Sequence, residues 1–120
     1  MAKIVVVDDA SFMRGSLKFI LETAGHEIVG MGKDGAEAEQ LYKELMPDLM
    51  TMDILMKGVD GLTALKKIRE NYPEAKIVMV TALGQETKEA EARDLGAAGY
   101  IRKPFKQKEI VDAVAAVLAG

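Results

Sequence analysis

The chain has 120 residues, 49% of them hydrophobic and 29% charged, which is the ordinary range for one soluble globular domain, so we expect a single domain over residues 1–120. Its 16 Lys and Arg against 19 Asp and Glu give a net charge of −3, which excludes an overall basic field for nucleic acid or acidic lipid. The absence of Cys excludes disulfides, thiolate metal sites and cysteine nucleophiles. No apolar segment approaches a signal-peptide core or a membrane span, and we expect a cytoplasmic protein with no direct nucleic-acid or membrane partner.

Short apolar runs alternate with amphipathic stretches along the chain, which is the pattern of βα units around a parallel sheet. The runs that predict strands cover residues 4–7, 28–31, 49–52, 77–80 and 99–101. The first and fourth are continuous and β-branched, as is typical of central strands covered on both faces. The predicted fold class is α/β, a doubly wound, flavodoxin-like (βα)5 domain. Its five-stranded parallel sheet takes the known order 2-1-3-4-5 of such folds, with helices on both faces.

A helix is predicted after each strand from apolar residues at helical spacing. The first ends where Gly25 is placed to cap its C-terminus. The second begins with a capping box of Asp34 and Glu37 and has a buried face formed by Ala38, Leu41, Tyr42 and Leu45. The third and fifth also have an unambiguous buried face. The fourth, from about Gly84 to Leu95, offers mainly Ala90, Ala92 and Leu95 as apolar residues, so we expect it to be the least firmly docked helix.

Polar residues stand at the ends of four predicted strands. Asp8 and Asp9 follow the first strand and Asp53 the third, while Thr81 follows the fourth and Lys103 the fifth. In open α/β sheets, ligands bind beyond the carboxyl ends of the strands, at the point where the strand order reverses. Under the order 2-1-3-4-5, the three acids converge between the first and third strands.

Three converging carboxylates repel one another, and a hard divalent cation is the simplest way to hold them together. Mg²⁺ suits best, because it accepts one or two carboxylates, keeps several waters and completes its octahedron with a phosphate oxygen. The pocket therefore predicts a phosphoryl ligand. Asp53 is the predicted nucleophile that forms an aspartyl phosphate, since Asp8 and Asp9 form a pair suited to the metal. Lys103 is the predicted cation and Thr81 the hydroxyl donor.

Each of these assignments has a simpler alternative. Asp8 and Asp9 could merely favour the positive end of a helix dipole. Asp53 could be an exposed turn residue, Thr81 a strand end with a satisfied hydroxyl, and Lys103 a solvated charge. Taken singly, the alternatives for Asp53, Thr81 and Lys103 outweigh a functional role, whereas the alternative for Asp8 and Asp9 is about even with it. Three acids, a hydroxyl and a lysine gathered at four strand ends are nevertheless hard to reach by chance.

Six short segments carry a resemblance to a known family. They are Val7-Asp8-Asp9, Ser11-Phe12-Met13-Arg14, Met52-Asp53, Gly58-Val59-Asp60-Gly61, Val80-Thr81-Ala82 and Tyr100-Ile101-Arg102-Lys103-Pro104-Phe105. With these segments, the chain resembles over essentially its whole length the receiver domain of two-component response regulators. Among them it is most similar to the stand-alone, CheY-like chemotaxis type.

The resemblance implies that Asp53 accepts a phosphoryl group from a histidine kinase or a small phosphodonor. It implies a Mg²⁺ site formed by Asp8, Asp9, Asp53 and the backbone carbonyl of Leu55, and phosphate contacts from Lys103 and Thr81. Tyr100 would be a rotameric switch that turns inward as Thr81 moves toward the phosphoryl group, although an ordinary half-buried strand aromatic is the simpler alternative. The family often has a cis peptide bond before the residue that matches Pro104.

The function implied is a phosphorylation-activated signalling switch that binds an output protein, and chemotaxis or motility is the expected role. The flagellar motor switch is a candidate target and a phosphatase a candidate further partner. Such a domain assists its own phosphorylation and dephosphorylation but is not an enzyme in the usual sense. A phosphorelay intermediate is one alternative. A Mg²⁺-dependent phosphohydrolase is weaker, because Leu55 stands two residues after Asp53, where a second acid would serve as acid or base.

Several residues depart from the family pattern or stand outside it. Lys57 lies where a proline is usual. Leu55 and Leu83 are apolar at positions that tune dephosphorylation in the family, and we hypothesise that they hinder the attacking water and prolong the phosphorylated state. Phe12 and Phe19, away from the apolar stripe of the first helix, are candidates for a partner surface. The lone histidine, His26, is interpreted as a surface turn residue.

Overall fold

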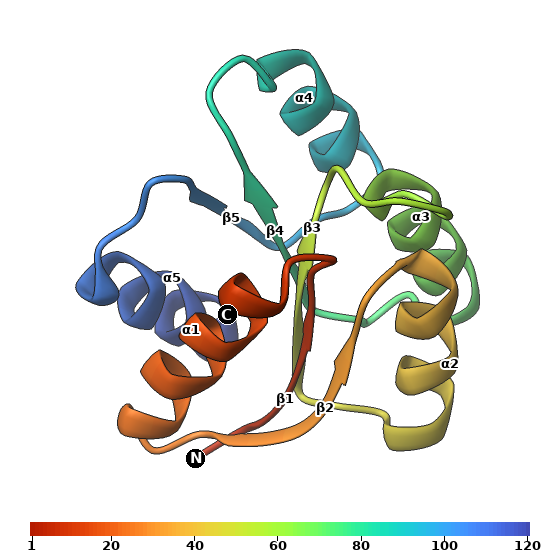
Figure 1. Ribbon diagram of the computed structural model, residues 1–120. Coiled ribbons are helices and arrows are strands. Elements are labelled where there is room, and N and C mark those ends of the chain that lie inside the picture. The colour runs from red at the N-terminus through yellow and green to blue at the C-terminus, as the bar shows by residue number, and fades with distance from the viewer.

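A parallel sheet of five strands runs through the middle of the computed structural model, which describes residues 1–120 (Figure 1). The strands are β1 (Lys3–Val7), β2 (Glu27–Gly32), β3 (Leu49–Asp53), β4 (Ile77–Thr81) and β5 (Gly99–Arg102). Their order is β2-β1-β3-β4-β5 and every neighbouring pair is parallel, which confirms the predicted fold class.

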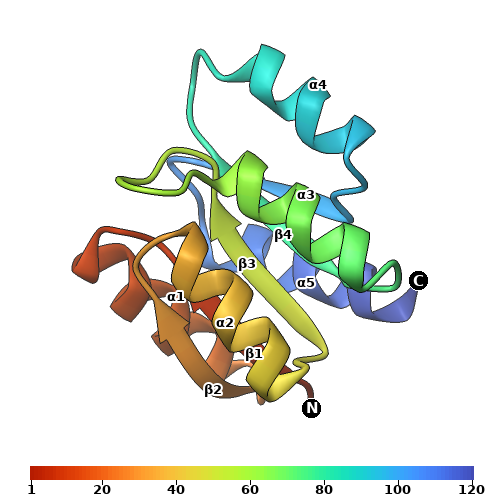
Figure 2. The ribbon, with the colours of Figure 1, turned by 90° about the vertical axis from the view of Figure 1, so that its right-hand side faces the viewer.

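Helices cover both faces of this sheet. They are α1 (Ser11–Thr23), α2 (Gly35–Leu45), α3 (Gly61–Asn71), α4 (Glu86–Asp94) and α5 (Gln107–Ala119). Helices α1 and α5 pack on one face and α2, α3 and α4 on the other, as the two views show (Figures 1 and 2). No helix combines the length and the apolar character that a membrane crossing demands.

The central strands are buried on both faces, so their side chains alternate between two cores. In β1, Val5 and Val7 pack against the side of α2 and α3, while Ile4 and Val6 pack against the side of α1 and α5. All residues of β3 and β4 are buried as well. This two-sided burial holds the strand ends, and therefore the site, in a fixed arrangement.

The local signals for the helix ends are largely confirmed. Gly25 follows α1 with a positive φ of 95°, the backbone conformation expected of a capping glycine. Asp34 accepts the Glu37 backbone N–H at the start of α2. The Glu37 carboxylate bonds the N–H of Lys33, one residue before the cap, so the reciprocal half of the predicted capping box is displaced. Leu45, expected on the buried face of α2, is exposed.

Helix α4 differs from its prediction in which residues it buries. It begins at Glu86, two residues later than expected, and Ala90 is exposed rather than buried. Its buried residues are Glu89 and Ala92. One of the two side chains that dock α4 is therefore a carboxylate, and what this acid contacts is described with the site.

His26 lies in the turn between α1 and β2, as interpreted, but it is half-buried rather than fully exposed. Its Nδ1 accepts the Ala2 backbone N–H at 3.2 Å, which ties the start of the chain to the turn before β2. Burial lowers the pKa of His26, with a smaller contribution from the positive charge of the N-terminus. The side chain is explained by this structural contact.

Candidate functional site

The predicted site residues lie at the carboxyl ends of the strands, around the point where the strand order reverses. Val7 of β1 is paired with Met52 of β3, so Asp8 and Asp53 come next on adjacent strands. Asp53 and Thr81 are the last residues of β3 and β4. Each of these strands therefore ends one residue later than predicted. Lys103 follows β5, where its backbone N–H donates to the Thr81 carbonyl at 2.7 Å. The crevice expected at this edge of a doubly wound sheet is thus lined by acids and a lysine.

Three carboxylates meet at this edge of the sheet. Asp8, Asp9 and Asp53 each offer an oxygen within 4.8 Å of the others, and Asp8 and Asp53 are buried. One Asp8 oxygen accepts the Ala10 backbone N–H at 2.9 Å, whereas the other is buried without a hydrogen-bond partner. Burial, and next to it the charge of Asp53, raise the pKa of Asp8 despite the Ala10 hydrogen bond. An oxygen-only donor set in which one buried oxygen has no hydrogen-bond partner fits a hard divalent cation, so this cluster could bind a metal.

Lys103 reaches between two of these acids. Its Nζ lies 2.9 Å from Oδ2 of Asp53 and 3.6 Å from Oδ2 of Asp8, and its side chain is 27% exposed. Partial burial alone would lower the pKa of Lys103, but the hydrogen bond and charge of Asp53, together with Asp8, raise it. The ammonium is therefore a fixed positive charge against Asp53. The Lys103–Pro104 peptide bond is cis, as the resemblance implied.

The loop after Asp53 is fixed by two glycines whose role the sequence pattern did not reveal. The Gly61 N–H donates to the Ile54 carbonyl at 2.9 Å, and a Cβ on Gly61 would lie 2.1 Å from the carbonyl oxygen of Asp53. Gly35 donates to the Val59 carbonyl at 2.7 Å, at the other end of the loop. The starts of α2 and α3 thus press directly on the segment that carries Asp53, and only glycine allows such an approach.

The hydroxyls of Thr81 and Tyr100 do not donate to the aspartates of the cluster. Both donate to Glu89 of α4. The Thr81 hydroxyl donates to Oε2 of Glu89 at 2.8 Å. The half-buried Tyr100 hydroxyl donates to the Glu89 backbone carbonyl at 3.4 Å, and the Arg93 guanidinium lies 5.8 Å from the centre of the Tyr100 ring. Glu89 is absent from the sequence-based site, because a glutamate on a polar helix resembles any solvated residue.

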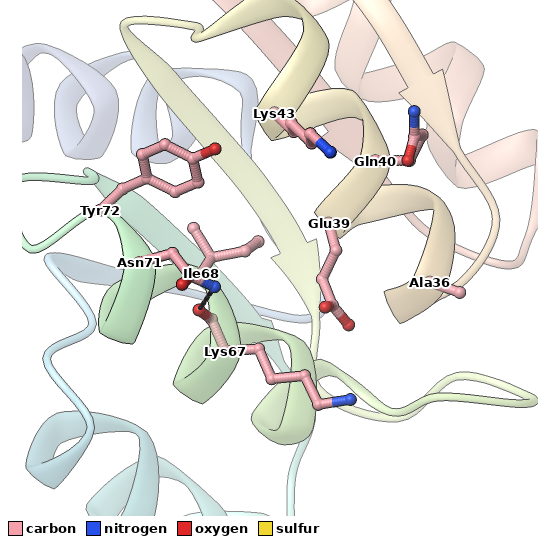
Figure 3. Close-up of a pocket in the computed structure, with 8 residues that line it drawn as sticks. All are labelled: Ala36, Glu39, Gln40, Lys43, Lys67, Ile68, Asn71 and Tyr72. Atoms are coloured by element: carbon pink, nitrogen blue, oxygen red, sulfur yellow. Dashed lines mark hydrogen bonds between the residues drawn. The ribbon is translucent and has the colours of Figure 1, made fainter.

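A groove between α2 and α3 lies apart from this site and contains none of the predicted residues (Figure 3). Exposed lysine and amide side chains and the half-buried Glu39 surround it, and the Asn71 amide donates to the Lys67 carbonyl at 3.0 Å along its wall. The lining residues are Ala36, Glu39, Gln40, Lys43, Lys67, Ile68, Asn71 and Tyr72. The groove offers no convergent set of buried polar groups, so the cluster of Asp8, Asp9 and Asp53 remains the candidate functional site.

The doubly wound fold and its acidic crevice place the chain among small α/β domains suited to phosphoryl chemistry. More particularly, the chain belongs to the response regulator receiver domain family, whose model matches residues 4–115. As a receiver domain of a two-component system, it is a phosphorylation-activated signalling switch.

Relatives match the chain over nearly its whole length. Protein CcdB of Bacillus subtilis is 45% identical over 118 residues, 98% of each chain. Chemotaxis protein CheY of Thermotoga maritima is 44% identical over 112 residues, 93% of each chain. Among solved structures, the CheX–CheY–BeF3–Mg complex of Borrelia burgdorferi is similar, with a TM-score of 0.92 and 32% identity over 96% of this chain and 87% of that chain.

Proposed function

We propose that Asp53 is the phosphoacceptor of this receiver domain and that Mg²⁺ binds beside it. The metal ligands would be Asp8, Asp9, Asp53 and the backbone carbonyl of Leu55, whose N–H donates to the Asp53 carboxylate at 3.2 Å. Lys103 and Thr81 would contact the phosphoryl group. The observation that carries the proposal is the contact of Asp53 with the Lys103 ammonium at 2.9 Å, next to a buried Asp8 oxygen that has no hydrogen-bond partner.

The proposed reaction transfers a phosphoryl group to a carboxylate. An Asp53 oxygen forms a bond to phosphorus while the bond from phosphorus to the donor breaks, and the leaving group keeps that electron pair. Lys103 holds the carboxylate and then faces the negative oxygens of the acyl phosphate. Bound Mg²⁺ supplies positive charge that neutralises the transferring oxygens. In this way the domain assists its own phosphorylation. Water that attacks phosphorus breaks the bond to the Asp53 oxygen, which releases inorganic phosphate and restores the carboxylate.

The donor is proposed to be a histidine kinase or a small phosphodonor, and the output is the binding of another protein. The whole-length similarity to CheY proteins supports a role in chemotaxis or motility, with the flagellar motor switch as a candidate target. A phosphatase is a further candidate partner, and the complex of the Borrelia relative with a second protein, CheX, supports such a further partner. Phe12 and Phe19 are both exposed on α1 and support a partner surface there. Such a switch would work in the cytoplasm.

Incubation with acetyl phosphate and Mg²⁺ tests the proposal by intact mass. The wild-type protein is expected to gain one phosphoryl group, whereas Asp53→Asn and a sample treated with a chelator are expected to gain none. Asp112→Asn, which removes an exposed carboxylate on α5, is the matched control and should be modified like the wild type. A wild-type mass that never changes, or equal modification of Asp53→Asn, would contradict the assignment.

The lifetime of the phosphoryl group provides a second prediction. Leu55 is 53% exposed beside Asp53, and Leu83 is 94% exposed after β4, so a polar group at either position would be able to orient water near the crevice. Leu55→Asn and Leu83→Glu are therefore expected to speed phosphate loss several-fold. The measurement is the decay of the modified mass after removal of the donor. Unchanged or slower decay in both variants would end the hypothesis that these leucines protect the acyl phosphate.

A further inference from the structure

An ion pair between the buried Glu89 of α4 and the exposed Arg102 of β5 lies next to Thr81, the proposed phosphate contact. The Glu89 side chain is 6% exposed, and its Oε1 accepts Nη2 of Arg102 at 2.8 Å. Its Oε2 accepts both the Thr81 hydroxyl at 2.8 Å and Nε of Arg102 at 3.2 Å. Two nitrogens of the Arg102 guanidinium therefore donate to the two oxygens of the Glu89 carboxylate. This bidentate geometry fixes the orientation of a carboxylate. Helix α4 and strand β5 are joined at this point.

The Arg102 hydrogen bonds also keep Glu89 a strong acceptor. They are the main reason why the pKa of Glu89 lies below its ordinary value, since they outweigh burial, which would raise it. The carboxylate is thus ionised at neutral pH although it is buried. The Arg102 side chain is 74% exposed, so the cation of the pair stays largely hydrated.

The Thr81 hydroxyl has a single hydrogen to donate. While the hydroxyl donates that hydrogen to Glu89, it cannot donate it to a phosphoryl oxygen at Asp53. Thr81 is fully buried at the end of β4, so its hydroxyl has no bulk water as an intermediate partner. The bond to Glu89 and a bond to a phosphoryl group therefore exclude each other.

We infer that Glu89 is a positioning residue that holds the Thr81 hydroxyl away from the acidic crevice, and that Arg102 in turn fixes Glu89. A phosphoryl group on Asp53 has to compete with the Glu89 carboxylate for this hydroxyl. This inference rests on the proposed role of Thr81 as a phosphate contact. Because the Tyr100 hydroxyl donates to the Glu89 carbonyl, release of Thr81 loosens contacts that join β4, α4 and β5.

Binding of beryllofluoride with Mg²⁺, a stable mimic of the phosphoryl group, measures this competition. Glu89→Ala is expected to lower the beryllofluoride concentration at half-saturation about fivefold, the change that corresponds to one net hydrogen bond of about 1 kcal/mol. Arg102→Gln should lower it less, because Glu89 keeps its bond to Thr81 but loses the group that fixes it. Glu91→Ala, an exposed acid on the same helix, is the matched control and should leave the midpoint unchanged.

A double-mutant cycle separates positioning of Thr81 from mere docking of α4. In a Thr81→Val background there is no hydroxyl to hold, so Glu89→Ala is expected to have no further effect on the midpoint. If Glu89→Ala changed the beryllofluoride midpoint equally in both backgrounds, Glu89 would only dock the helix, and the inference would be overturned. An unchanged midpoint in the Glu89→Ala single variant would also overturn it. Should Glu89→Ala fail to fold, Arg102→Gln in the same two backgrounds carries the test, since Arg102 is exposed.

The NMR signal of the Thr81 methyl group, recorded without metal or beryllofluoride, tests the positioning directly. It is expected to shift in Glu89→Ala and to stay in place in Glu91→Ala. An unshifted signal in Glu89→Ala would overturn the inference whatever the protein binds. A wild-type protein that never binds beryllofluoride, or an Asp53→Asn variant that binds it equally well, would instead overturn the proposed function. The two failures are therefore distinguishable.

Discussion

Lys103→Ala is expected to bind Mg²⁺ about tenfold more tightly than the wild type and to accept a phosphoryl group about a hundredfold more slowly. Nζ of Lys103 lies 2.9 Å from an Asp53 oxygen and 3.6 Å from an Asp8 oxygen, so it partly neutralises the charge that would attract a cation. At an effective dielectric constant of about 20, two unit charges about 4 Å apart interact by about 4 kcal/mol. Solvent and side-chain rearrangement offset much of this, which is why we expect a tenfold rather than a thousandfold gain.

The slower modification has a separate cause. Charge builds on the phosphoryl oxygens during transfer, and a preorganised cation in a water-poor site typically contributes a factor of about a hundred or more to such a step. Calorimetric titration with Mg²⁺ gives the first quantity, and the rate of mass gain with acetyl phosphate gives the second. Weaker Mg²⁺ binding in Lys103→Ala would contradict the place assigned to the ammonium.

Lys57→Ala is the matched control for Lys103→Ala. Lys57 is exposed, and its link to the crevice is a backbone N–H that donates to Asp9 at 3.3 Å, which the substitution leaves in place. An exposed charge is screened by solvent and salt, so Mg²⁺ affinity should change by no more than about twofold. An effect as large as that of Lys103→Ala would show that general charge, rather than the fixed contact with Asp53, determines metal affinity.

Gly61→Ala is expected to destabilise the fold by about 3 kcal/mol and to lower the melting temperature by roughly 10 °C. The added Cβ would lie 2.1 Å from the Asp53 carbonyl oxygen and 2.9 Å from Cα of Ile54. Both neighbours are backbone atoms at the end of a fully buried strand, so no flexible side chain can yield. Relief requires α3 to move away from β3, which would also displace Asp53.

Gly15→Ala provides the opposite expectation in the same kind of element. Gly15 lies within α1, and a Cβ added there would meet no atom within 4 Å beyond the helix's own backbone, so alanine should stabilise the helix by about 0.5–1 kcal/mol. Urea or thermal unfolding followed by circular dichroism measures both variants. A Gly61→Ala protein whose free energy of unfolding stays within about 0.5 kcal/mol of the wild type would show that the start of α3 is not firmly seated.

The sheet and the meeting of the acids can be predicted from the sequence because both follow from local patterns and one general rule. Short apolar runs predict the strands, and residues at their carboxyl ends meet at one edge of any parallel sheet. Asp8 and Asp53 are therefore neighbours as soon as the strand order is known. The predicted ends of the third and fourth strands are one residue too early. The backbones of Asp53 and Thr81 still pair with the neighbouring strand, and their residue types do not signal that pairing.

The burial of Glu89 could not be predicted in the same way. Helical periodicity assigns acidic residues to the solvent face, because burying a charge is costly without a partner. The partners exist, but Thr81 and Arg102 are 8 and 13 residues away and come from two different strands. Their approach depends on the register of β4 and β5, in which Thr81 lies opposite Arg102. A pattern confined to α4 contains none of this information.

The position of β5 at the border of the sheet has a mechanical consequence. Asp8 and Asp9 directly follow β1 and Asp53 ends β3, and each of these strands has a bonded strand on both sides, whereas β5 is bonded to β4 alone. Tyr100 therefore lies in, and Lys103 directly follows, a strand that is bonded on one side only, as β2 is at the opposite border. A chemical change at Asp53 can therefore displace β5 without breaking hydrogen bonds between the other strands. The surface formed by β5 can change while the core around β1 and β3 stays intact.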